Sequence, residues 1–232
     1  MFRKILLLLS LYILFIYVYT WRNILILKNI EYPIKNLYKD DIKTGDIFLL
    51  GNKKKDKIFG DSLFMIKFIH PSIAVWENYN LYIVEFALYP DKKGLLKIPF
   101  DNWIRYNKNK RILRSVLEIK NEDLYERDII KNNILSYYEN NRKRINNMNS
   151  DFNITWLRFP LRIKSELNLD NISCTEVLAE IICSSGIAKK DKGSSYYHQS
   201  DFISLSGFAL NNKFSYPNNY LCKFQHLMKK YI

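Results

Sequence analysis

The sequence predicts an α+β domain in which an antiparallel sheet packs against a helix carrying Cys174, preceded by an N-terminal transmembrane helix. Strand-like apolar runs separated by polar turns, a helix-capping pattern and an uncharged N-terminal run support this class. The strands and helices do not follow the βαβ alternation of a parallel sheet. We expect an anchor over residues 1–28, a linker over 29–40 and one domain over 41–232, long enough for a single core.

The first segment is an apolar run without charge from Ile5 to Trp21. At about 1.5 Å per residue, its length is at the short end for a bilayer core of roughly 30 Å. A cleavable signal peptide is the alternative, but bulky residues stand where a cleavage site needs small ones. The run therefore predicts an uncleaved single-pass anchor, with the lipid bilayer as a partner.

The flanks of this run predict the side on which the domain lies. More basic residues follow the run than precede it, and the positive-inside rule then favours a cytoplasmic domain. The three cysteines agree, because an odd count provides no disulfide framework. The glycosylation sequon Asn171-Ile172-Ser173 also argues against a eukaryotic lumen, since a glycan there would crowd Cys174.

Strands and a helix are expected in the middle of the chain. Residues 46–50 follow a Thr-Gly turn and form a short apolar run, which predicts a buried strand. Residues 111–119 predict another strand of the sheet. Over residues 121–145 apolar side chains recur near helical spacing, with Glu and Lys on the other faces, and this indicates an amphipathic helix.

Residues 68–76 and 81–86 are two strand-like runs joined by the polar link 77–80. This spacing is typical of an antiparallel hairpin. His70 would begin the first strand and Glu85 would lie near the end of the second. The hairpin therefore predicts that these two side chains can meet across the ladder.

Cys174 follows Ser173, and Glu176 completes a capping box, so a helix is expected to begin at Ser173 and to end at Gly186. At the first helical position, unpaired backbone N–H groups and the helix dipole favour an anion. A thiol in that field loses its proton more easily, and the same N–H groups can hold an oxyanion. The alternative is that Cys174 is a small core residue on an apolar helix.

Cys174, His70 and Glu85 are the residue types of a thiol nucleophile, its base and the group that orients the base. Each also has a structural interpretation: a core cysteine, a hydrogen-bonded histidine and an exposed strand glutamate. Together they form the hypothesis of a Cys-His-Glu catalytic triad.

The order of these segments resembles a known family. Gly45-Asp46-Ile47 opens a strand, the His70 strand and the Glu85 strand follow, and residues 173–178 then begin the cysteine helix. This order resembles the circularly permuted papain-like hydrolases. They are the NlpC-like group that includes the bacterial YiiX/YebB-like proteins, the lecithin–retinol acyltransferase family and relatives from poxviruses and giant viruses. In ordinary papain-like enzymes the Cys precedes the His, whereas here the His comes first, as in the permuted branch.

The resemblance covers roughly residues 41–202, with a long divergent insert between 114 and 171. It implies a permuted papain-like fold. It also implies that Cys174 is the nucleophile, His70 the base and Glu85 the third, orienting residue.

The formal charge of +13 comes from 36 Lys and Arg against 23 Asp and Glu. No recognised nucleic-acid motif accompanies this charge, so we expect no nucleic-acid partner and favour attraction to anionic lipid headgroups as the use of the charge. The alternative is that the bias toward Ile, Lys, Asn and Tyr reflects an A/T-rich genome, which would explain much of the charge without a function. No spacing of His and Cys is typical of a metal site, and we expect neither a metal nor a cofactor.

These observations predict a membrane-anchored thiol hydrolase (an amidase or peptidase) or an acyltransferase, acting on an amide- or ester-containing substrate through an acyl-enzyme. Peptidoglycan peptide, protein and lipid ester all remain open as the acyl donor. The alternative is a catalytically silent structural membrane protein of the same fold that binds a lipid or a peptide.

Overall fold

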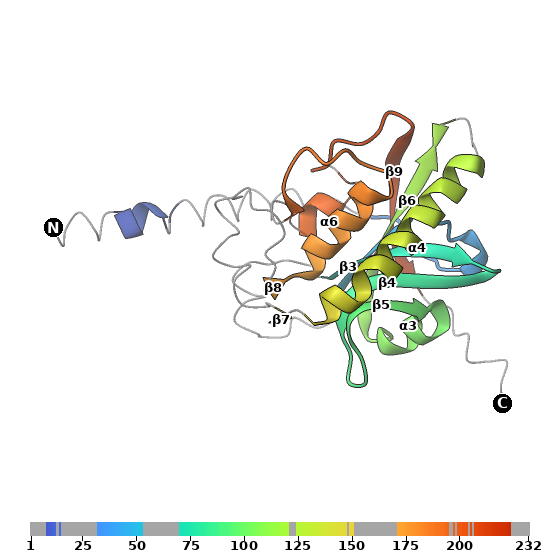
Figure 1. The fold of residues 1–232 in the computed structure, drawn as a ribbon, viewed down its shortest axis with the longest axis horizontal. Helices are drawn as coiled ribbons and strands as arrows, with labels where there is room; N and C mark the ends of the chain where they lie inside the picture. The colour runs from blue at the N-terminus through green and yellow to red at the C-terminus, as the bar shows by residue number, and fades with distance from the viewer. Residues whose placement is uncertain are drawn as a thin grey trace.

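The structure is a computed structural model that describes residues 8–12, 14, 32–52, 70–120, 124–147, 149–150, 171–194, 197, 199–203, 205 and 207–223. Within these residues the strands form a seven-stranded sheet in the order β1-β9-β6-β2-β3-β4-β5 and a separate β7–β8 pair (Figure 1). In chain order the elements are β1 Ile34–Asn36, η1 Lys39–Asp41, β2 Ile47–Asn52, β3 His70–Glu77, β4 Asn80–Leu88, β5 Lys93–Pro99, α3 Phe100–Tyr106, β6 Lys110–Ile119, α4 Leu124–Asn146, β7 Asn149–Ser150, β8 Asn171–Ile172, α6 Cys174–Ser184, η4 Gln199–Phe202 and β9 Phe214–Lys223.

The mixed α+β class predicted from the sequence is confirmed. Neighbouring strands of the large sheet are antiparallel except β1 and β9, which run parallel, with Ile34 opposite Leu221. Strand β1 lies inside residues 29–40, the segment predicted as a linker. Its pairing joins two segments far apart in the sequence, and such a pairing leaves no local pattern to detect.

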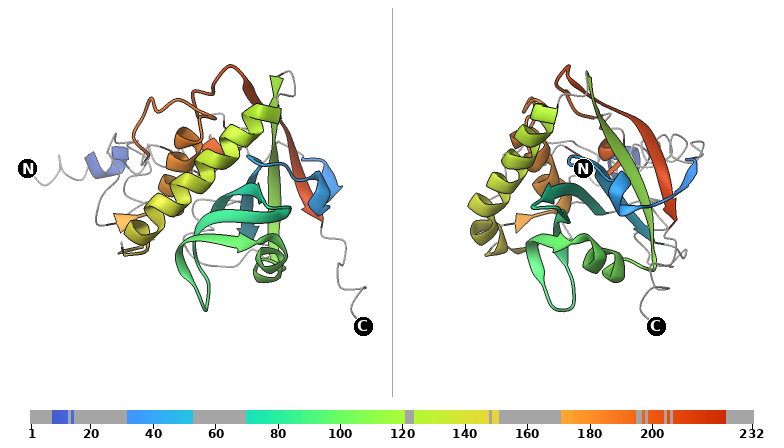
Figure 2. Two further views of the ribbon diagram at one scale, coloured as in Figure 1. Left: turned by 45° about the vertical axis from the view of Figure 1, so that its right-hand side comes forward. Right: turned by 90° about the vertical axis from the view of Figure 1, so that its right-hand side faces the viewer.

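Helices cover both faces of the sheet, as the two views of Figure 2 show. Side chains alternate along β2, because successive residues of a strand point to opposite faces. Ile47 and Leu49 pack into the cluster that includes buried residues of α4 and α6. Phe48 and Leu50 pack into the opposite cluster, which includes Trp103 of α3. The sheet therefore has an apolar layer on each side.

The predicted hairpin is formed by β3 and β4, with Ile73 opposite Val84. Its turn has two residues, Asn78 and Tyr79, which have φ angles of 48° and 61°. Positive φ at both central positions is the geometry of a type I′ turn, whose twist matches that of the strands. The turn therefore fixes the register of the hairpin, in which the start of β3 lies beside the end of β4.

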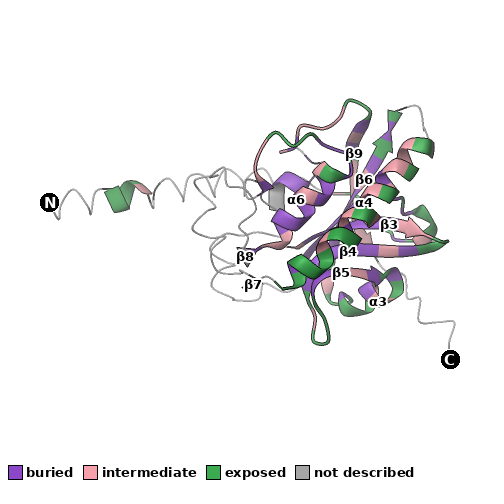
Figure 3. Ribbon diagram, in the orientation of Figure 1, coloured by how far each residue is buried: buried purple, intermediate pink, exposed green. Residues whose placement is uncertain are grey.

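The two long helices differ in burial (Figure 3). Helix α6 is buried over most of its length. Helix α4 confirms the predicted amphipathic helix: Ile130, Ile134 and Tyr138 are buried, while its other faces are largely exposed. The helix that carries Cys174 packs against β3 and β4.

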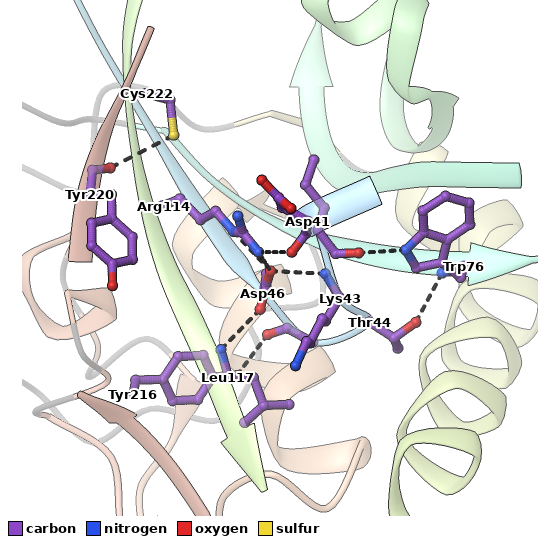
Figure 4. Close-up of polar contacts among 12 residues, drawn as sticks. Asp41, Lys43, Thr44, Asp46, Trp76, Arg114, Leu117, Tyr216, Tyr220 and Cys222 are labelled. Atoms are coloured by element: carbon purple, nitrogen blue, oxygen red, sulfur yellow. Dashed lines mark hydrogen bonds and ion pairs between the residues drawn. The ribbon is translucent and has the colours of Figure 1, made fainter. Parts of the chain in front are cut away.

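The carboxylate of Asp46, which is fully buried, joins β2 to β6 (Figure 4). It accepts hydrogen bonds from the backbone N–H groups of Lys43 and Leu117 at 3.0 and 2.9 Å and from Arg114 Nε at 2.9 Å. Burial raises the pKa of Asp46, while Arg114 and these N–H groups act against that rise. In the Gly-Asp-Ile segment that opens β2, Asp46 therefore has a structural role at the start of the strand.

The prediction of a single-pass N-terminal anchor is overturned. Among the residues that the structure describes, no helix is both long and apolar enough to cross a membrane. Spanning a bilayer takes about 20 helical residues, whereas residues 8–12 and 14 are the described part of the predicted span. The rest of residues 1–28 lies outside the described residues. The membrane location inferred from the anchor is corrected with it.

Candidate active site

His70 and Glu85 are in direct contact, as the predicted hairpin requires. His70 is the first residue of β3, and its side chain remains 19% exposed. Glu85 lies within β4 and is 1% exposed. His70 Nε2 donates to Glu85 Oε2 at 2.9 Å. The structural alternative of an exposed strand glutamate is therefore excluded.

Two further side chains hold the same carboxylate, and neither was identified from the sequence. Tyr89, just after β4, donates its hydroxyl to Glu85 Oε1 at 2.5 Å. Trp103 of α3 donates its indole N–H to Glu85 Oε2 at 3.1 Å. The Trp103 contact depends on how the chain returns from β4 through β5 to α3, and no local sequence signal reveals it. Tyr89 follows Glu85 by four residues, and the two-residue period of a strand, which places both side chains on one face, is the signal that could have identified it.

Cys174 is the first residue of α6, and the predicted helix start is confirmed. Ser173 is the N-cap: the Glu176 N–H donates to Ser173 Oγ at 3.3 Å, and the Ser173 N–H donates to Glu176 Oε2 at 2.8 Å. This reciprocal capping fixes the first turn of the helix. Cys174 is half-buried at the end of the helix where the backbone dipole is positive.

Cys174 and His70 interact directly. Burial alone would lower the pKa of His70, but hydrogen bonds with Cys174 and Glu85 and the charges of both partners raise it to about 10. Since Nε2 of the ring is bonded to Glu85, Nδ1 is the nitrogen left for the thiol. The ring thus bridges sulfur and carboxylate. A pKa near 10 makes His70 an imidazolium at neutral pH.

The other two cysteines lie in different surroundings. Burial, followed by the charge of Glu180, raises the pKa of Cys183 to about 11, and burial raises that of Cys222 to about 12. Both thiols are hydrogen-bonded to backbone carbonyls. They are therefore protonated at neutral pH. Of the three cysteines, Cys174 is the one at a helix N-terminus beside a histidine.

The described part of the chain contains no group of three or more His, Cys, Asp or Glu side chains that could hold a metal ion.

No family model matches the sequence, and no curated protein matches it either. Among solved structures, the chain is similar to the metalloprotein yiiX from Escherichia coli O157:H7, DUF1105. The two are 11% identical, and the alignment covers 78% of this chain and 88% of that one with a TM-score of 0.41. Similarity of this size does not assign the chain to the permuted papain-like family.

Proposed function

We propose that this protein is a thiol hydrolase (an amidase or peptidase) or an acyltransferase of the permuted papain-like type. One observation carries the proposal: a half-buried cysteine at a helix N-terminus, a histidine and a buried carboxylate are in contact in that order. This is the arrangement of a nucleophile, a general base and an orienting group.

Burial of the His70–Glu85 pair is a second support. Taking two charges out of water costs several kcal/mol per ion, and apolar side chains of similar size commonly replace such pairs without loss of stability. The pair lies beside Cys174, whose thiol is reduced. A binding protein of the same fold has no use for a buried ion pair with this desolvation cost. A thiol enzyme needs the charge of Glu85 to stabilise the His70 imidazolium.

In the proposed reaction the Cys174 thiolate attacks the carbonyl carbon of an amide or ester, and a C–S bond forms. The oxyanion that results lies at the N-terminus of α6, where the helix dipole favours negative charge. When the intermediate collapses, the bond to the leaving nitrogen or oxygen breaks. The leaving group takes the proton of His70 Nδ1, and a thioester remains on Cys174.

The second half of the reaction restores the enzyme. Neutral His70 takes a proton from water, or from an acceptor hydroxyl or amine, and the deprotonated oxygen or nitrogen attacks the thioester. The C–S bond then breaks and the thiolate leaves. Water as acceptor gives a hydrolase, and another acceptor gives an acyltransferase. Throughout both steps Glu85 keeps the imidazole ring oriented and stabilises its charged form.

An activated ester, p-nitrophenyl acetate, tests the proposal without knowledge of the natural substrate. We expect an acetyl adduct on Cys174 by intact-mass and peptide-mass analysis, absent from Cys174→Ala and retained in Cys183→Ala, the matched control. His70→Ala should form the adduct far more slowly. Acetylation spread equally over the three cysteines would exclude the nucleophile and favour a catalytically silent binding protein. So would the absence of an adduct together with no release of p-nitrophenol above that of Cys174→Ala.

A further inference from the structure

Glu85 lies within a closed ring of hydrogen bonds that the proposed reaction does not use. Besides the bonds from Tyr89 and Trp103, the Nδ2 amide of Asn107 donates to the Tyr89 hydroxyl at 3.0 Å and to the Trp103 carbonyl at 2.9 Å. Asn107 is the C-cap of α3 and is 4% exposed. The indole of Trp103 thus contacts the carboxylate directly, and the amide of Asn107 is linked to it through the Tyr89 hydroxyl.

The donors in this ring can point in one direction only. An amide nitrogen donates and does not accept, so the Tyr89 oxygen must accept from Asn107. The single hydroxyl proton of Tyr89 is then directed at Glu85 Oε1. Burial, followed by the charge of Glu85, raises the pKa of Tyr89, which keeps this donor protonated. The indole N–H of Trp103 can only donate, and it takes Glu85 Oε2.

A buried carboxylate without donors takes up a proton, since burial disfavours its charged form. A protonated Glu85 would no longer stabilise the His70 imidazolium across their 2.9 Å contact. Hydrogen bonds to an ionised group are stronger than neutral ones and act on the charged form alone. The charge on Glu85 therefore depends on the residues that donate to it.

We propose that Tyr89, aligned by Asn107 and aided by Trp103, is a positioning residue that keeps Glu85 ionised and turned toward His70. This inference rests on the proposed function for its meaning in catalysis, but the proton balance that it describes is a property of the folded protein alone. It places the control of the His70 charge in the turn after β4 and in α3, away from Cys174.

The test follows the Nε2 proton of His70 by NMR in protein labelled with ¹⁵N-histidine, where only three histidines contribute. As the pH falls, this signal changes when the hydrogen bond from His70 to Glu85 is lost. Tyr89→Phe removes one donor to the carboxylate. The midpoint of the change in the His70 signal should rise by about one to two pH units, which corresponds to a 10- to 100-fold weaker hold on the bonded form.

Tyr106→Phe is the matched control. Tyr106 stacks on Tyr89 with ring centroids 4.5 Å apart, but its hydroxyl bonds Asp91 at 3.0 Å and not Glu85. Removing that hydroxyl should leave the midpoint unchanged. Asn107→Ser, which keeps Tyr89 but loses its aligning amide, should raise the midpoint by less than Tyr89→Phe, and it decides the question if the phenylalanine variant does not fold.

An unchanged or lower midpoint in a folded Tyr89→Phe or Asn107→Ser protein would overturn the positioning role. So would an equal rise in Tyr106→Phe, because it would indicate a general loss of packing. Alkylation of Cys174 in the same samples separates the two proposals. A wild-type Cys174 no more reactive than Cys183 contradicts the proposed function, while the His70 midpoints still decide the role of Tyr89.

Discussion

Selective alkylation of Cys174 follows from the different surroundings of the three cysteines. The thiolate is the reactive form, and the pKa of Cys183 is raised to about 11 and that of Cys222 to about 12. At pH 7 these values leave about 1 in 10⁴ and 1 in 10⁵ of each thiol ionised. A more basic thiolate is more nucleophilic, so on a logarithmic scale about half of the rate lost to incomplete ionisation is regained. Relative to a fully ionised thiol, Cys183 is thus roughly 100-fold slower. Cys174 lies beside His70 at the N-terminus of α6, and it should react at least about 10-fold faster than Cys183.

The assay is limited reaction of the folded protein with iodoacetamide at pH 7, followed by peptide mass analysis of each cysteine. In urea the three rates should converge, since the differences arise from folding. His70→Ala should slow Cys174 and leave Cys183 unchanged. Equal rates at all three sites in the folded protein would show that Cys174 has no activated thiol.

Three further outcomes are expected. Glu85→Gln should keep the fold but slow alkylation of Cys174, because an amide stabilises the His70 imidazolium poorly; an unchanged rate would remove Glu85 from the triad. Asp46→Asn should lower the unfolding free energy by about 3–5 kcal/mol, since it leaves Arg114 buried without its anion. In the exposed control Asp128→Asn, thermal or urea unfolding should show a loss of unfolding free energy under about 1 kcal/mol. Equal losses in the two variants would exclude burial as the cause of the Asp46 effect. Folding raises the pKa of His70 from 6.5 to about 10, so its stabilising contribution is complete below pH 6.5 and disappears as the pH approaches 10; urea unfolding across this range should show a smaller decline in His70→Gln.

Local patterns predicted the parts of the site that depend on local structure. The capping box placed Cys174 at the first position of α6, and two strand-like runs joined by a polar link placed His70 and Glu85 on paired strands. Both features are local, because a capping box lies within one helical turn and a hairpin pairs two consecutive strands. They are therefore visible in the sequence before any tertiary contact is known.

Contacts made through the tertiary fold were not predicted. Trp103 reaches Glu85 from a helix on one face of the sheet, and Asn107 reaches Tyr89 from the end of that helix. Strand β1 joins the sheet through β9, near the other end of the chain. Such contacts leave no periodic signature in a single sequence. The predicted anchor was wrong, since no helix among the described residues is long and apolar enough to cross a membrane.

The charge of His70 is the most direct measure of whether Cys174, His70 and Glu85 act as a unit. ¹⁵N chemical shifts of the ring, followed from pH 5 to 11, report the protonation of both nitrogens. We expect wild-type His70 to remain an imidazolium until about pH 10, and Cys174→Ala to lower that midpoint, because the hydrogen bond with Cys174 is the largest influence that raises it. A His70 that titrates near 6.5 in both proteins would contradict the triad.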